Sequence, residues 1–188
     1  MVQQTILNGI ELGELSDCMS SLRQSPDIGK CTFKVTSKWL AGAHCLTEID
    51  DFSASGETIH RDKTHLIEAD EPVLFLGTDQ AANAAEALLH ALGACLNASF
   101  IYHATDQGIS IESLEIELAG NIDINGFLGL NEEIHNGFES IDVAFHVKSD
   151  APREKIEELC QYAQQRSPVF DTITSPVPVT VSLEINSG

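Results

Sequence analysis

The spacing of apolar positions changes several times along the first half of the chain, and each change predicts a new element. Residues 10–22 repeat apolar side chains at helical intervals until a Ser-Pro pair ends the pattern, which predicts a short amphipathic helix. Residues 31–39 alternate instead, which predicts a half-buried strand. The buried face of that strand would carry Cys31, Phe33, Val35 and Trp39. Two more strands are expected at 44–52 and 64–69, which completes an antiparallel meander.

The second half begins with a segment that is apolar on nearly every side, residues 83–105. Such a segment predicts a helix buried within its own fold or against a partner. Alternation at 114–124 and 141–147 predicts two strands, Asp150 and Pro152 open another helix, and residues 177–185 alternate as a closing strand. Blocks of adjacent strands interrupted by two helices indicate an α+β fold with a mainly antiparallel sheet.

Composition narrows the class of protein. Hydrophobic residues make up 43% and charged residues 21% of 188, which is typical of a globular chain. We expect no membrane-spanning run and no secretory signal, and therefore a cytoplasmic location. The formal net charge of −19 would repel phosphate backbones and anionic lipid, so neither nucleic acid nor membrane is expected as a partner.

Five cysteines are present, an odd number with no Cys-x-x-Cys pair. They indicate neither a disulfide framework nor a zinc site, and they suit a reducing compartment. Cys45 lies next to His44, and His60 or His65 could join them, but the spacing matches no recognised site. No metal and no cofactor are expected.

The segment 70–79 and the helix 83–95 carry a family resemblance. The helix, Asn-Ala-Ala-Glu-Ala-Leu-Leu-His-Ala-Leu-Gly-Ala-Cys, is similar to the Asn-Pro-x-Glu-x-Leu-Leu-x-Ala-Leu-x-x-Cys helix of the OsmC/Ohr family, with Ala84 where proline is usual. A second stretch, Arg-Ser-Pro-Val-Phe at 166–170, stands at the position of the family's Cys-Pro-Val motif. The resemblance extends from about residue 33 to residue 185.

This resemblance implies an OsmC/Ohr-like fold and an intertwined homodimer, with two long helices at its centre and the active sites between the subunits. We expect a helical appendage at 1–28 and the OsmC-like domain at 29–188.

The resemblance places the family's peroxidatic thiol at Cys95, whose thiolate would attack the O–O bond of an organic hydroperoxide. From the residues alone, a packed core thiol is the alternative, because Cys95 shares a helical face with Leu88, Leu92 and other apolar side chains. A free thiol with a pKa of about 8.5 is only a few per cent ionised at neutral pH, so a cation should lie close by. Three candidates could stabilise the thiolate: Arg166, Arg61 and His44.

Two positions depart from the family pattern. Ser167 stands where two-cysteine peroxidases have their resolving cysteine, and serine forms no disulfide. Cys160 lies two helical turns earlier, roughly 10 Å along the axis, which is too far to take its place. Glu86 fits the family's motif acid, although the commoner peroxidases have it one position earlier. On a regular helix Glu86 faces away from Cys95, so it would serve a site only across the dimer interface or from a kinked first turn, and otherwise the helix start alone.

The remaining thiols Cys18, Cys31 and Cys160 are expected to pack in the core. Three hypotheses follow. The first is a one-cysteine enzyme that reduces small organic hydroperoxides and is regenerated by an external thiol. The second is a non-catalytic dimer that binds a small apolar or thiol metabolite in its interface pocket. The third is a redox-inert structural protein.

Overall fold

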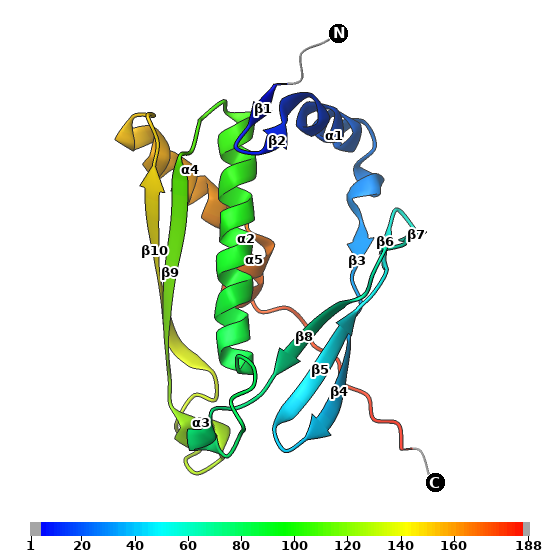
Figure 1. Cartoon of the computed structure of the whole chain (residues 1–188), viewed down its shortest axis with the longest axis vertical. Helices are drawn as coiled ribbons and strands as arrows, with labels where there is room; N and C mark the ends of the chain where they lie inside the picture. Colours follow the sequence, from blue (N-terminus) through cyan, green and yellow to red (C-terminus); the bar gives the residue numbers. More distant parts are fainter. Residues whose placement is uncertain (1–4, 186–188) are drawn as a thin grey trace.

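The computed structural model describes residues 5–185, and it opens with a small hairpin followed by a helix (Figure 1). Strands β1 (Ile6–Leu7) and β2 (Ile10–Glu11) pair around Asn8 and Gly9, which both have positive φ, and helix α1 (Leu12–Gln24) follows. The amphipathic helix predicted at 10–22 is therefore confirmed two residues later. A 3-10 turn, η1 (Pro26–Gly29), ends this segment.

The side chain of Asn8 fastens this hairpin to a distant part of the chain. Its Nδ2 donates to Thr105 Oγ1 at 3.1 Å and to the Ile109 carbonyl at 2.9 Å. Its Oδ1 accepts from the Ile111 amide at 2.8 Å. Three hydrogen bonds from one side chain thus tie the N-terminal segment to the far end of the central helix.

Two three-stranded antiparallel sheets follow. One has the order β3-β6-β7, formed by Cys31–Thr32, Phe52–Ala54 and Glu57–Ile59; the other has the order β4-β5-β8, formed by Thr36–Ala41, His44–Ile49 and His65–Ala69. The strand predicted at 31–39 is therefore two strands in two different sheets. The β6–β7 hairpin was not predicted.

The apolar face expected to be buried on these strands is exposed. Cys31, Phe33 and Val35 lie open to solvent, and 75% of the Trp39 surface is accessible. The prediction of a half-buried strand is wrong for the single chain, because no other part of the described chain covers that face. Figure 1 shows the β4-β5-β8 sheet standing apart from the central helix.

The remaining elements pack around one long helix. The turn η2 (Val73–Phe75) leads into α2 (Ala84–Asp106), which is followed by strand β9 (Ser113–Ile122), the short α3 (Ile124–Phe127), strand β10 (Phe138–Lys148), α4 (Arg153–Arg166) and α5 (Pro168–Thr174). Strands β9 and β10 form an antiparallel pair beside α2, and α4 and α5 pack against the helix (Figure 1). The prediction of an α+β fold with antiparallel sheets is confirmed.

The core lies between α2, α4 and the β9–β10 hairpin. Phe100 and Ala104 of α2 pack against Leu159 and Ala163 of α4, and all four are fully buried or nearly so. Helix and strand come together closely at Gly93, where a Cβ atom would lie 2.9 Å from Leu118 Cδ1. Glycine at this position therefore permits the packing distance.

Within the single chain helix α2 is buried on one side only, so burial of its other faces against a partner stays a prediction. Its buried residues follow one stripe: Leu92, Leu96, Phe100, Ala104 and Thr105. Leu88, one turn before Leu92, and Tyr102 are exposed. By length and composition alone α2 could cross a membrane, contrary to the expectation that no apolar run reaches that length; core helices of soluble proteins pass the same test.

The C-terminal segment forms no strand in the single chain. Residues 175–185 belong to no helix or strand, so the strand predicted at 177–185 is not formed. The alternating apolar side chains are all exposed: Val177, Val179, Val181, Leu183 and Ile185.

Candidate active site

The start of α2 is fixed by a reciprocal pair of hydrogen bonds. The Asn83 side chain accepts from the Glu86 amide at 2.8 Å, and the Glu86 carboxylate accepts from the Asn83 amide at 2.9 Å. This capping box satisfies two backbone donors that a helix start leaves unpaired. Glu86 is exposed, and its carboxylate serves the helix start within this chain.

Cys95 lies midway along α2 as a free, half-buried thiol. It sits beside the buried stripe rather than in it: Leu96 is completely inaccessible and Leu92 nearly so, whereas the surface of Cys95 is partly open. The sulfur is therefore not sealed within the core of the single chain. A partly exposed thiol on a rigid helix can be reached by a small molecule.

Ser167 is completely buried where α4 ends and α5 begins. Its hydroxyl accepts from the Phe170 amide at 3.3 Å and so caps α5, in which Pro168 occupies the first turn. Helix α5 packs against α2 and lies beside the middle of that helix (Figure 1).

An aromatic and cationic cluster joins α4 to α2. The Arg166 guanidinium lies 5.2 Å from the centre of the Tyr162 ring, and the His103 ring meets the same tyrosine edge to face at 4.6 Å. Burial lowers the pKa of His103, and the positive charge of Arg166 lowers it further against the opposing effect of Asp106. Arg166 is therefore close enough to α2 to act on a titratable group of that helix.

The other two cationic candidates lie in the N-terminal sheets. His44, at the start of β5, pairs with Glu68 of β8 at 2.8 Å. Arg61 follows β7 and stacks over the ring of Phe52 at 5.4 Å. Neither makes a described contact with α2 within one chain.

The four other cysteines occupy different environments. Cys18 and Cys31 are exposed, so the expectation that they pack in the core is wrong for the single chain. Cys160 is half-buried against the core, and burial, reinforced by the charge of Glu157, raises the pKa of its thiol. Cys45 is half-buried in β5. Within residues 5–185, no three His, Cys, Asp or Glu side chains are grouped so that they could hold a metal ion.

Sequence reasoning missed the role of Asp70, which organises the loop before α2. Its carboxylate accepts from the Thr78 hydroxyl at 2.6 Å and from the amides of Glu71, Thr78 and Gln80 at 2.9 to 3.3 Å. These bonds, that of the Thr78 hydroxyl first, lower the pKa of Asp70 to about 2. An Asp-Glu-Pro turn followed by Gly-Thr was the available signal, because a short acid beside turn residues often bonds nearby amides.

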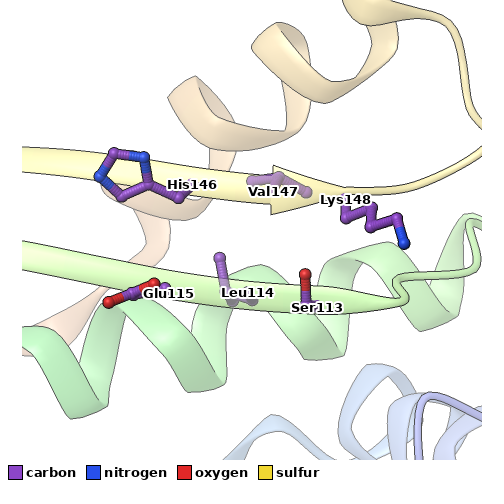
Figure 2. Close-up of a pocket in the computed structure, with 6 residues that line it drawn as sticks. All are labelled: Ser113, Leu114, Glu115, His146, Val147 and Lys148. Atoms are coloured by element: carbon purple, nitrogen blue, oxygen red, sulfur yellow. The ribbon is translucent and has the colours of Figure 1, made fainter.

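One hollow of about 630 Å³ lies between β9 and β10, lined by the six residues labelled in Figure 2. Among its residues, His146 pairs with Glu117 and Lys148 with Glu112. The hollow is an open surface between two strands, and its cationic groups already have carboxylate partners. We therefore assign no chemistry to it.

A family model described as "OsmC-like protein" matches residues 77–182. The search of curated proteins found no match. Solved structures with a similar fold include an OsmC-like protein from Mycoplasma pneumoniae (18% identity, 77% of this chain and 89% of that chain, TM-score 0.58). Another is an organic hydroperoxide resistance protein OsmC from Legionella pneumophila (19% identity, 77% and 90%, TM-score 0.52). A third is a protein from Psychrobacter arcticus described as a putative osmotic stress induced and detoxification response protein (18% identity, 77% and 88%, TM-score 0.53).

Proposed function

Because the chain belongs to the OsmC-like protein family, we propose that it reduces small organic hydroperoxides with a single reactive cysteine, as a cytoplasmic defence against oxidative stress. One observation carries the proposal: the free thiol of Cys95 lies midway along α2 and is partly open rather than sealed in the core. This is the position at which the family resemblance places the peroxidatic sulfur.

The proposed reaction has two stages. The Cys95 thiolate attacks the terminal oxygen of the hydroperoxide, the O–O bond breaks, and the leaving alkoxide takes a proton and departs as an alcohol. Cys95 is left as a sulfenic acid. An external thiol then condenses with it, releasing water and forming a mixed disulfide, and a second thiol reduces that disulfide. Two thiols are oxidised to one disulfide for each hydroperoxide reduced.

Arg166 is the cation that we propose to stabilise the thiolate. It is the one candidate whose influence reaches α2 within one chain, through Tyr162 and His103. His103 lies eight residues beyond Cys95, about 12 Å along the helix. The proposal requires the arginine side chain to turn from the tyrosine ring toward the sulfur when the site is occupied. Arg61 and His44 would reach Cys95 only from the partner subunit.

An external reductant is proposed because the resolving position holds Ser167, whose hydroxyl caps α5. Glu86 is proposed to assist the site across the subunit interface, because on a regular helix it faces away from Cys95 of its own chain.

We propose that the active protein is a homodimer. Two groups of exposed apolar side chains are ones that a second copy could cover. One group lies along residues 33–40 and includes Phe33, Val35, Trp39 and Leu40; the other is the C-terminal segment with Val177, Val179, Val181, Leu183 and Ile185. A row of alternating apolar residues with unpaired backbone groups is suited to pairing with a strand of another chain.

A non-catalytic dimer that binds a small apolar or thiol metabolite remains the second candidate, favoured by the serine at position 167. The test is peroxide consumption by the full-length protein with excess dithiothreitol and cumene hydroperoxide. We expect Cys95→Ser to lower the rate at least about 100-fold, because it removes the nucleophile. The matched Cys160→Ser variant should retain it. Equal rates for wild type and Cys95→Ser would exclude the enzymatic proposal.

Two further variants test the roles of positions 166 and 167. Arg166→Gln should move the alkylation of Cys95 to higher pH, since the thiolate would lose its cation. Ser167→Cys should convert the oxidised protein from a sulfenic acid to an internal disulfide, detected by intact mass. Absence of that disulfide in a folded variant would show that position 167 is not within reach of Cys95.

A further inference from the structure

A small pocket on the N-terminal sheets gathers cationic side chains in a strongly acidic chain. It measures about 380 Å³ and lies where the chain passes from β7 to β8. Its lining residues are Phe52, His60, Arg61, Asp62, Lys63 and His65. Figure 1 shows the β6–β7 hairpin well separated from α2, so within one chain this pocket is not part of the site around Cys95.

The Arg61 side chain is held by aromatic rings rather than by an acid. Its guanidinium lies 5.4 Å from the centre of the Phe52 ring, and Phe33 stacks on the same ring with the two ring centres 5.3 Å apart. The Nε atom of Arg61 is buried and has no hydrogen-bond partner among the described residues. Stacking on a ring face leaves the in-plane N–H groups of a guanidinium unused, and a buried donor without an acceptor is unfavourable.

The loop that carries these residues is ordered in advance. Asp51 accepts from the Arg61 amide at 2.9 Å and from His60 Nδ1 at 2.6 Å, and Asp50 accepts from the Thr64 hydroxyl. The bond from the Arg61 amide, followed by that from His60, lowers the pKa of Asp51. Both oxygens of Asp51 are therefore engaged with the loop rather than with the Arg61 guanidinium.

Among the residues that line the pocket, His60 pairs with Asp51 at 2.6 Å, whereas Arg61 and Lys63 form no ion pair with the described residues. Lys38, Lys148 and Lys155, in contrast, each have a carboxylate within 4.0 Å. Residues 27–65 hold five of the ten basic residues of the chain but six of its 29 acidic ones. Asp62 is the carboxylate on the pocket wall that would oppose an anion.

We propose that this pocket binds a small oxyanion, a carboxylate or a phosphate group, on the guanidinium of Arg61, with Lys63 supplying further positive charge. A guanidinium offers two parallel N–H donors that match either group. The proposed site uses neither Cys95 nor Arg166, the two residues on which the proposed peroxidase reaction depends.

Inorganic phosphate and acetate, titrated separately into the full-length protein, test the proposal through the backbone amide signals of residues 60–65. We expect saturable shifts with at least one of the two ions, and the better ligand identifies the class. Arg61→Gln should raise the dissociation constant at least tenfold, which corresponds to about 1.4 kcal/mol. Lys63→Gln, which leaves the ring stack intact, should raise it severalfold.

The matched control is Lys34→Gln, which removes one positive charge from the same part of the chain outside the pocket. It should leave the dissociation constant within twofold of wild type. No saturable shift with either ion would overturn the proposal. So would an equal loss of affinity in Lys34→Gln and Lys63→Gln, because binding would then reflect general charge rather than this pocket.

Discussion

The two halves of the molecule bury their apolar side chains to very different extents. The C-terminal half has a core of its own, in which Phe100 and Ala104 meet Leu159 and Ala163. The β4-β5-β8 sheet has no buried side chain except at its boundary with the following loop, and it presents Trp39 and Leu66 to solvent. Half of the fold is thus complete within one chain, while the other half carries an apolar face that nothing in the chain covers.

The proposed homodimer would therefore stabilise the two halves unequally. Covering the exposed face would add stability to the N-terminal sheet in proportion to the apolar area removed from water. The C-terminal core would gain little, because it is already closed. Stability of the first half should therefore depend on protein concentration, and that of the second should not.

The largest effect is expected from a pair of truncations, one in each half. Phe100→Ala should cost about 3–5 kcal/mol at any protein concentration, because it leaves a cavity in a closed core. Trp39→Ala should cost little at high dilution, where the ring is already exposed, and more at concentrations where dimers form. Denaturant unfolding at two protein concentrations, with the mass measured by light scattering, separates the two.

Two results together would contradict the contrast between the halves. The mass of the protein would be the same at both concentrations, and Trp39→Ala would lose the same free energy of unfolding at both. Thr36→Ala serves as the control, since it alters an exposed side chain at the start of the same strand without removing an aromatic ring.

The next largest loss of stability is expected from the hydrogen bonds that join the N-terminal hairpin to the C-terminal half. Asn8→Gly keeps the positive φ accessible but removes three hydrogen bonds to Thr105, Ile109 and Ile111. We expect a loss of about 1–3 kcal/mol in the free energy of unfolding. Amide exchange at Ile111 should also accelerate. If Ile111 stays as protected as in wild type, the hairpin does not fasten the end of α2.

The smallest effect is expected in the loop before α2, whose order should depend on pH. The folded pKa of Asp70 is about 2, below the ordinary value of 3.8, so its contribution is complete above about pH 4 and is lost as the pH falls through 2. The protection of the Thr78 and Gln80 amides against exchange, relative to the intrinsic rate at each pH, should therefore fall between pH 4 and pH 2 in wild type. Asp70→Asn should show fast exchange throughout that range.

Asp79→Asn is the matched control, because it neutralises an exposed acid in the same loop and asparagine tolerates the positive φ found there. It should keep the wild-type pH profile. A flat wild-type profile would show that the Asp70 bonds do not order the loop.

Elements that pack within the chain could be predicted from the sequence. The long helix, the β9–β10 pair and α4 were each found within a few residues, because their periodicity reflects burial by neighbours in the same chain. The sequence also predicted a C-terminal strand and a buried face at 31–39, and the single chain shows neither. Alternation records that a face is apolar, but it does not say whether this chain or another covers it.

The sequence indicated residues of the candidate site only where they belong to a recognisable motif. Cys95 and Ser167 were placed by the family resemblance, and Asn83 and Glu86 form a capping box that their spacing allows. The stacking of Arg61 and the hydrogen bonds of Asp70 depend on loops that bring together residues without regular spacing. The β6–β7 hairpin was missed although Ser55 and Gly56, both with positive φ, mark its turn.

The contacts of Asn8 also bear on the order in which the chain assembles. They join residues 97 to 103 positions apart, so a chain growing from its N-terminus must extend past residue 111 before the hairpin can find its acceptors. Closing so long a loop is slow compared with forming a helix or a hairpin. The hairpin that carries Asn8 is therefore among the last segments to reach its native place.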